Sequence, residues 1–200
     1  MISIAIPYYP MQNAEYFMDR CIKSIESQKN VDYEIVITEN PGGWSANHNE
    51  AIKKCKGDII KFLHMDDYLY HANCLEMIEK KFKPNSWLVT GCIHNRTSTG
   101  DLFNIHNATW NNDIFTGNNT IGGPSVLTIE NNNPILFDED LTWLVDCDYY
   151  MKLYKRYGEP VILDTICVGI GIHDGQATNI ISNERKAQEV KLMKQRYDII

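Results

Sequence analysis

Two adjacent carboxylates follow directly after an apolar run in the first half of the chain. The run Ile59–Leu63 is typical of a buried strand, and two residues separate it from Asp66 and Asp67. In an open parallel sheet, ligands bind at the carboxyl ends of the strands, and acidic side chains there can hold a divalent cation through oxygen ligands. Such a cation would neutralise the phosphate charge of a bound nucleotide. The alternative is that Asp66 or Asp67 only caps the helix that we expect from about Tyr70.

A second pair of carboxylates, Asp146 and Asp148, opens the segment Asp146–Tyr157, which has helical spacing. The helix dipole favours anions at an N-terminus by about 0.5 kcal/mol each, which would explain both residues without any function. A catalytic role requires a carboxylate that takes the proton from an attacking hydroxyl group. Trp143 precedes the pair by about one turn, where an indole ring can pack on a sugar or belong to the core.

Other candidate binding residues also follow strand-like runs. Pro7 and Tyr8 end the first run, Glu39 ends the second, and His173 follows a late one. A carboxylate can accept the imide N–H of uracil or thymine, an aromatic ring can stack on the base, and histidine with carboxylates suits Mn²⁺ better than Ca²⁺. The structural alternatives are that Tyr8 fills the sheet edge, that Glu39 is solvated, and that His173 is an ordinary hydrogen-bonded histidine.

The composition is that of a globular protein with one generous domain. The chain has 200 residues, 44% of them hydrophobic and 22% charged, which is enough to bury a core. A net charge of −7 and a pI near 5.3 argue against a nucleic-acid partner. No apolar run reaches the length of a membrane span, and the apolar start Met1–Pro7 lacks the cationic residues of a signal peptide. Six separated cysteines without a Cys-x-x-Cys pair indicate reduced thiols and a cytoplasmic protein.

Strand-like and helix-like patterns alternate over residues 1–92, which predicts a mostly parallel sheet with right-handed crossovers. The expected strands are Ile2–Pro7, Glu34–Thr38, Ile59–Leu63 and Trp87–Cys92, and the helices between them are Ala14–Gln28, Ser45–Lys54 and His71–Phe82. Residues 94–119 are polar and predict a loop region with a short hairpin. Later strands are expected at Ser125–Ile129, Val161–Leu163 and Val168–Ile172, with a charged helix over Asn183–Tyr197. We therefore expect a single domain, with residues 1–92 binding a nucleotide and 93–200 forming the acceptor side.

Six motifs in one order resemble the family 2 glycosyltransferases of the GT-A fold over nearly the whole chain. They are Ser3–Tyr9, Tyr33–Asn40, Ala46–Ile52 followed by Phe62–Asp67, Gly122–Ser125, Asp138–Trp143 with Asp146–Leu153, and His173–Gln176. The resemblance implies a Rossmann-like, mostly parallel sheet flanked by helices, with a small mixed C-terminal part for the acceptor. Three positions depart from the family pattern: Asn40 replaces the second acid, His48 an arginine, and His64 the leading aspartate of the acidic box.

The resemblance also implies a role for each matching residue. Asp146 corresponds to the catalytic base, and Asp67 and His173 to ligands of Mn²⁺ or Mg²⁺. The nucleotide-sugar and acceptor contacts implied are Pro7, Tyr8, Glu39, Asn49, Asp66, Gly123, Trp143 and Asp148.

The leading hypothesis is an inverting, metal-dependent glycosyltransferase that moves a sugar from a UDP- or dTDP-sugar to a glycan or lipid-linked acceptor in surface polysaccharide synthesis. This hypothesis is compatible with a cytoplasmic protein that associates peripherally with the inner face of the membrane. The second hypothesis, supported by the departures at Asn40, His48 and His64, is a nucleotide-sugar-binding module without turnover. The third is a metal-dependent phosphoesterase, although the chain lacks the paired His/Asp blocks of a two-metal centre.

Overall fold

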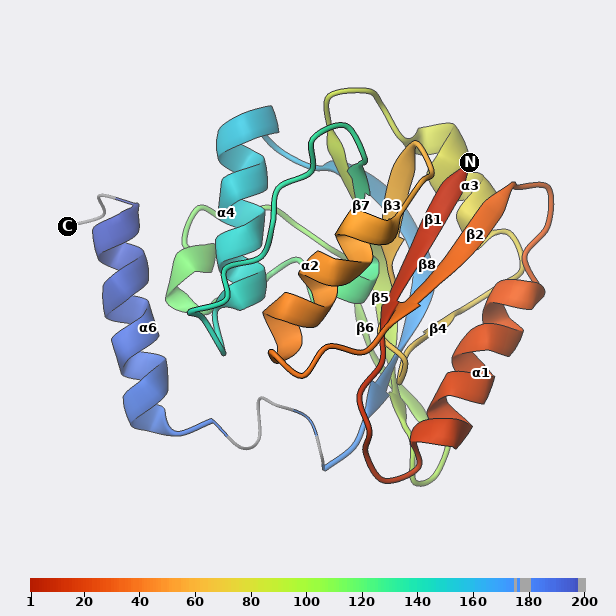
Figure 1. Ribbon diagram of the computed structural model, residues 1–200, viewed down its shortest axis with the longest axis horizontal. Helices are drawn as coiled ribbons and strands as arrows, with labels where there is room; N and C mark the ends of the chain where they lie inside the picture. Colours follow the sequence, from red (N-terminus) through yellow and green to blue (C-terminus); the bar gives the residue numbers. More distant parts are fainter. Residues whose placement is uncertain (175, 177–180, 198–200) are drawn as a thin grey trace.

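A twisted sheet of eight strands forms the centre of the protein, and helices flank it (Figure 1). The computed structural model describes residues 1–174, 176 and 181–197. The strands are β1 (Ile2–Pro7), β2 (Tyr33–Thr38), β3 (Ile59–Phe62), β4 (Tyr68–Leu69), β5 (Trp87–Arg96), β6 (Leu102–His106), β7 (Leu127–Glu130) and β8 (Val161–Ile172). The helices are α1 (Ala14–Glu26), α2 (Trp44–Lys54), α3 (Cys74–Lys81), α4 (Val145–Tyr157) and α6 (Asn183–Arg196), with short 3₁₀ turns η1 (Ile114–Thr116) and η2 (Pro124–Val126).

The strand order is β2-β1-β3-β7-β5-β8-β4, with β6 paired to β5. Strand β1 pairs in parallel with β2 and β3, and β5 pairs in parallel with β8, whereas β7 is antiparallel to both of its neighbours and β4 is antiparallel to β8. The predicted α/β class with a mostly parallel sheet is therefore confirmed. Because Pro7 lies opposite Thr38 and Ala5 opposite Phe62, the first three strands end at the same edge.

Helix α1 shows how local spacing produces this arrangement. Its buried side chains Phe17, Cys21 and Ile25 recur every four residues, so that one face packs on the sheet. Helix α2 differs, because its buried face carries polar residues, among them Asn47, His48 and Asn49. Buried polar side chains need partners: Asn47 donates to Tyr8 O after β1 and His48 meets His64 after β3, whereas Asn49 pairs with the Phe137 backbone.

Several of the expected elements have different limits in the structure. The two late strands predicted at 161–163 and 168–172 belong to one strand, β8, which follows β5 through register shifts near Gly91. Strand β5 continues four residues beyond the predicted end and forms the expected hairpin with β6. Residues 124–126 form η2, so β7 begins only at Leu127. Helix α3 begins at Cys74, three residues after the predicted start.

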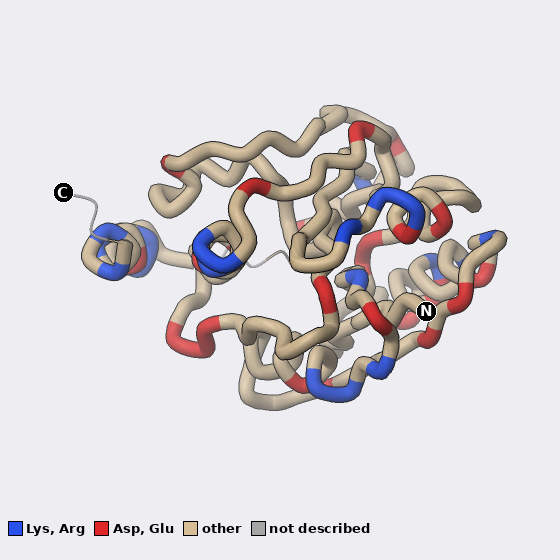
Figure 2. The backbone as a smooth tube through the Cα atoms, turned by 90° about the horizontal axis from the view of Figure 1, so that it is seen from above, with Lys and Arg blue, Asp and Glu red and all other residues tan. Residues whose placement is uncertain are grey.

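The core lies on both faces of the sheet and includes large aromatic side chains. Trp87 is fully buried and stacks on Tyr150, with ring centroids 5.8 Å apart. The six cysteines are free and five of them are buried, which agrees with the predicted reduced thiols. Among the described residues, no helix has the length and apolarity needed to cross a membrane. Lysine and arginine alternate with aspartate and glutamate over the described backbone and form no single basic stripe (Figure 2).

Candidate active site

The acidic box, residues His64–Asp67, follows β3 at the carboxyl edge of the sheet. His64, Asp66 and Asp67 each present a donor atom, and these three atoms lie within 4.8 Å of one another. Asp67 is almost fully buried, and its Oδ1 accepts a hydrogen bond from Gly171 N at 2.8 Å. Burial and the neighbouring Asp66 carboxylate raise the pKa of Asp67 well above its usual value. The group therefore fits a divalent cation, which would offset the repulsion between two buried carboxylates.

His64 is the member of this group that we did not predict as a metal ligand. Its Nε2 lies 3.0 Å from His48 Nε2, and its Nδ1 lies 4.0 Å from Asp67 Oδ2. Burial is the main cause that lowers the pKa of both histidines, so both rings are neutral at pH 7. His48 and His64, two of the three departures from the family pattern, thus contact each other, and only the tertiary structure reveals this contact.

The other side of the acidic box is held by His173 and Arg20. His173 Nε2 lies 2.9 Å from Asp66 Oδ2, and the ring stacks on Phe17 at 5.2 Å between centroids. The Arg20 guanidinium donates to the backbone oxygen of Asp66 and, at 3.1 Å, to Asn95 Oδ1. Burial opposes ionisation of Asp66. The hydrogen bond from His173 and the electrostatic effect of the His64 and His173 rings nevertheless leave the pKa of Asp66 below its usual value. His173 thus contacts Asp66 of the acidic box, and its role as a metal ligand stays a prediction.

Gly171 explains how β8 approaches the box so closely. A Cβ at this position would collide with the carbonyl oxygen of Asp66. Only glycine therefore allows the backbone of β8 to donate its N–H to Asp67 at this distance.

Asp146 lies at the start of α4, as predicted, and is held by two donors. Its Oδ2 accepts a hydrogen bond from Asn119 Nδ2 at 2.8 Å, and its Oδ1 accepts from Cys147 N at 2.8 Å. Asn119 also donates to Gly122 O at 3.0 Å. Desolvation by the surrounding protein raises the pKa of Asp146 to about 6, which is suitable for a base near neutral pH.

The glycine turn before β7 connects this carboxylate with the acidic box. Ser125 Oγ accepts a hydrogen bond from His64 N at 2.9 Å, and the buried Lys61 ammonium donates to Ser125 O. Burial lowers the pKa of Lys61 to about 8. At Gly123 a Cβ would meet no atom within 4 Å, so this residue faces open space.

Two predicted substrate contacts have partners within the protein. Asp148 is fully buried. Its carboxylate accepts hydrogen bonds from Arg196 Nη1 and Tyr197 Oη, each at 2.7 Å, and forms an ion pair with Lys152 Nζ at 2.7 Å. The Asn49 amide donates to Phe137 O and accepts from Phe137 N, at 3.0 and 2.8 Å. These contacts indicate that Asp148 and Asn49 position α4 and the segment before it.

The remaining predicted residues lie at the same edge but differ in exposure. Tyr8 is partly buried, its N donates to Thr38 O at 2.7 Å, and its O accepts from Asn47 Nδ2 at 2.9 Å. Pro7 is buried and Glu39 is exposed beside it. Trp143 is partly buried and lies over Gly117, with Lys186 Nζ 5.4 Å from its ring centre.

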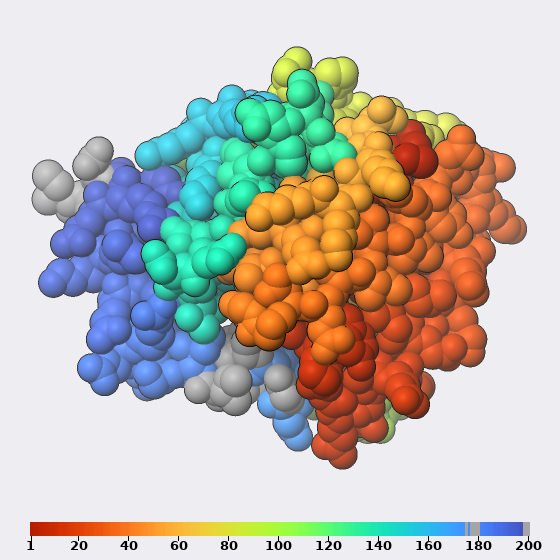
Figure 3. Space-filling model, viewed as in Figure 1, coloured from red at the N-terminus to blue at the C-terminus, as the bar shows by residue number. Residues whose placement is uncertain are grey.

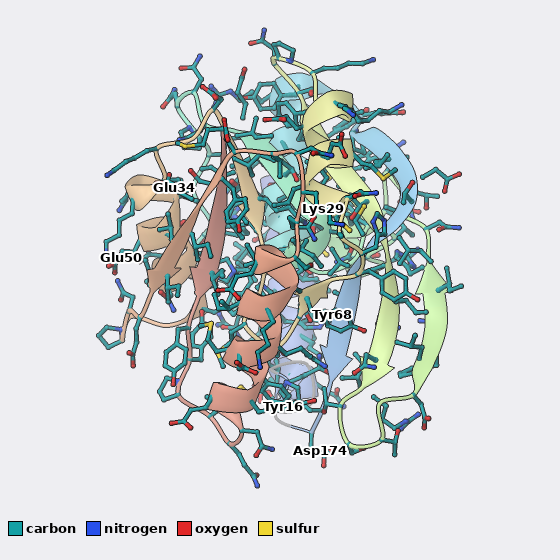
Figure 4. All side chains as sticks on the ribbon, turned by 90° about the vertical axis from the view of Figure 1, so that its right-hand side faces the viewer. Tyr16, Lys29, Glu34, Glu50, Tyr68 and Asp174 are labelled. Carbon is teal, nitrogen blue, oxygen red and sulfur yellow. The ribbon has the colours of Figure 1, made fainter. Side chains whose placement is uncertain are left out.

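A cavity of about 470 Å³ opens beside His173, between the start of α1 and the ends of β5 and β8. Tyr16 and Asp174, which both line it, lie at the same end of the molecule in Figure 4. Tyr8, Glu39 and Asp66 do not line this cavity, although Asp66 contacts His173, which does. The other lining residues are Met11, Gln12, Asn13, Phe17, Arg96, Thr97, Ser98 and Ile172.

The fold is shared with solved glycosyltransferase structures. TarS of S. aureus (residues 1–349, in complex with UDP-GlcNAc) superposes with a TM-score of 0.70 and 18% identity, over 97% of this chain and 65% of that one. The mannosyltransferase PcManGT of Pyrobaculum calidifontis, in complex with GDP-Man and Mn²⁺, gives a TM-score of 0.63 and 10% identity, over 98% of this chain and 64% of that one. The chain therefore has the GT-A fold, and spans less than two thirds of these two proteins.

At the level of sequence the similarities are weaker. No family model matches the chain. The uncharacterized protein MT1568 of Mycobacterium tuberculosis (strain CDC 1551 / Oshkosh) is 28% identical over 43% of this chain. The match covers 34% of that protein's own length.

Proposed function

We propose that this protein is an inverting, metal-dependent glycosyltransferase that uses a UDP- or dTDP-sugar. The observation that carries the proposal is the group of His64, Asp66 and Asp67 at the carboxyl edge of a GT-A sheet. TarS and PcManGT, which share this fold, were solved with a nucleotide-sugar, the second also with Mn²⁺. A glycan or a lipid-linked glycan is the proposed acceptor, in cytoplasmic synthesis of a surface polysaccharide.

Asp66 and Asp67 would hold the divalent cation, with His173 beside them. When bound, the cation supplies positive charge to the diphosphate that leaves. Tyr8 and Glu39 lie at the ends of β1 and β2, where an aromatic ring and an exposed carboxylate can bind the base. The open space at Gly123 leaves room for the sugar.

Asp146 is the proposed general base. The acceptor hydroxyl oxygen forms the new bond to the anomeric carbon while the bond from that carbon to the diphosphate breaks. Asp146 takes the hydroxyl proton on one carboxylate oxygen, and Asn119 fixes the position of the other. Attack from the side opposite the leaving group inverts the configuration at the anomeric carbon.

The experiment that tests the metal site compares wild type with Asp67→Asn, which keeps an acceptor for Gly171 N but removes the charge. Melting temperatures are measured with UDP, GDP or dTDP, each with and without Mn²⁺, because a ligand that binds only the native state raises the melting temperature. We expect Mn²⁺ to increase the shift caused by UDP in wild type but not in Asp67→Asn. An equal increase in both proteins would contradict the metal assignment.

Turnover assays separate the two other hypotheses. Tight nucleotide-sugar binding with neither transfer nor hydrolysis would indicate a binding module, and release of phosphate from simple phosphoesters would indicate a phosphoesterase.

A further inference from the structure

We infer that His64 binds the divalent cation directly through Nδ1, and that His48 fixes the tautomer that makes this possible. The inference rests on the proposed metal-dependent function and extends it to the identity of the metal. It assigns a role to the position where the resembling family has an aspartate, and to a second histidine that does not touch the metal.

The hydrogen bonds around His48 determine where the protons are. His48 Nδ1 lies 2.8 Å from Trp44 O, and a carbonyl oxygen can only accept, so Nδ1 carries the hydrogen. In a neutral ring Nε2 then has the lone pair. His48 Nε2 lies 3.0 Å from His64 Nε2, so the hydrogen between the two rings belongs to His64. His64 Nδ1 is therefore unprotonated, and this is the atom that faces Asp67.

The ring of His48 is also fixed in orientation. It is fully buried and stacks on Trp44 with ring centroids 3.7 Å apart, while the Trp44 ring meets His64 edge-on at 5.7 Å. Ser125 Oγ holds the backbone of His64 from the other side. A ligand histidine whose second nitrogen donates to a fixed acceptor is the usual arrangement of a protein metal site.

The ligand set indicates which metal the site prefers. One imidazole nitrogen with carboxylate oxygens suits Mn²⁺ and other transition metals, whereas oxygen ligands alone suit Mg²⁺. The substitution of histidine for the leading aspartate should therefore move the preference from Mg²⁺ toward Mn²⁺. Mn²⁺ is also a selective probe, because the other candidate group, His71, Cys74 and Cys167, has two thiols and favours softer metals.

The direct test is pulsed electron paramagnetic resonance of Mn²⁺ bound to the full chain, alone and with UDP, because it detects nitrogen bonded to the metal. We expect a nitrogen coupling in wild type that disappears in His64→Asp and remains in His173→Asn and in His71→Asn. Loss of the coupling in His173→Asn together with its retention in His64→Asp would overturn the inference. In His64→Asp, Mg²⁺ should displace Mn²⁺ at a lower concentration than in wild type.

His48 is tested as a positioning residue. His48→Phe keeps the stacked ring but removes the acceptor, so Mn²⁺ affinity should fall roughly 10- to 100-fold, as for other outer-sphere partners of metal ligands. His48→Gln supplies an amide oxygen to His64 Nε2–H and should restore most of the affinity. Equal Mn²⁺ affinity in wild type and a folded His48→Phe, checked by circular dichroism, would overturn the tautomer argument.

The outcomes also separate this inference from the proposed function. Bound Mn²⁺ without any nitrogen coupling would overturn the role of His64 and leave the metal-dependent transferase intact. No Mn²⁺ bound to wild type, with or without UDP, would overturn both.

Discussion

Asp146 and Asp148 lie two residues apart at the start of α4, yet their surroundings differ. Asp148 is fully buried and meets Arg196, Lys152 and Tyr197. Asp146 meets the neutral donors Asn119 and Cys147 N. Two cations hold the Asp148 carboxylate in ion pairs, whereas the Asp146 carboxylate is held by neutral donors at a raised pKa and can accept a proton. The contacts thus support Asp146 as the proposed base.

We expect Asp146→Asn to reduce transfer by about 10²–10⁴, the usual cost of losing a general base. Donor binding should change little, because the asparagine keeps the size of the side chain. Initial rates and UDP affinity of both proteins check this prediction. Near-normal transfer by Asp146→Asn would exclude Asp146 as the base.

Asp148→Asn is the matched control and should act on stability. Removing this charge breaks the ion pairs of a fully buried carboxylate with Lys152 and Arg196, although Arg196 keeps Asp138 at 2.6 Å, so we expect a cost of about 1–3 kcal/mol. Urea unfolding measures this loss. A loss of transfer in a folded Asp148→Asn at unchanged stability would exchange the two roles.

The pH dependence of transfer should show one acidic limb. The Asp146 carboxyl has a pKa of about 6 and acts as base only when ionised, so kcat/KM should fall as pH drops below about 6 and level off above it. The profile is measured with saturating Mn²⁺, and the Asp146→Asn profile serves as control. The same limb in Asp146→Asn would assign it to another group.

The raised pKa of Asp146 also affects the free energy of unfolding, which should fall with rising pH while the rate of transfer increases. Because the pKa is raised on folding, the native state binds this proton more tightly than the unfolded chain, and the stabilisation is lost as pH rises from about 4 to about 6. The stability of Asp146→Asn relative to wild type should therefore increase as pH rises from about 4 to about 8, which urea unfolding of both proteins measures.

At the scale of elements, α6 secures the start of α4. Glu189 of α6 is almost fully buried, and its carboxylate accepts hydrogen bonds from the N–H groups of Thr142, Trp143 and Leu144, each at 2.9 Å. Arg185 holds the carboxylate in place at 2.7 Å. In Figure 3, α6 packs along the segment that precedes α4. An element late in the sequence therefore sets the place of Asp146.

Glu189→Ala should lower the free energy of unfolding by about 1.5–3 kcal/mol, since three N–H groups lose a charged acceptor. Glu184→Ala, at an exposed position of the same helix, is the control and should change it by no more than about 0.5 kcal/mol. Urea unfolding and hydrogen exchange at residues 142–144 measure both. Equal stability of the two variants would show that α6 does not support this segment.

At the scale of the whole molecule, the sheet joins the two halves of the chain. Strand β7 from the second half pairs with β3 from the first and with β5. Lys61 of β3 is fully buried only because β7 and the turn before it supply carbonyl oxygens to its ammonium group. The first half alone would leave β3 with an open edge and this charge without its partners.

We therefore expect residues 1–92 alone to show no cooperative thermal unfolding, and the full chain to unfold in one transition. Far-UV circular dichroism and tryptophan fluorescence should give coincident curves for the full chain. A cooperative transition in the 1–92 fragment would divide the protein into two domains.

The sequence by itself determined the local elements and the places of chemistry. Strand β3 follows from a short, nearly continuous apolar run, and helix α1 from apolar residues at a period of 3.6; neighbouring residues alone define both patterns. Asp66, Asp67 and Asp146 were identified because carboxylates at the ends of such elements can bind a ligand or accept a proton. The GT-A fold was predicted because six motifs occur along the sequence in the same order as in the family that they resemble.

Only the tertiary structure decided the partners of each side chain. The antiparallel insertion of β7, the joining of two predicted strands into β8, and the contact of His48 with His64 all depend on segments that are separated in sequence. Asp146 and Asp148 could not be distinguished locally, because the Arg196 that neutralises Asp148 lies 48 residues away. The roles of these residues depend on burial and on neighbouring charge, and the folded chain sets both through contacts that no local pattern encodes.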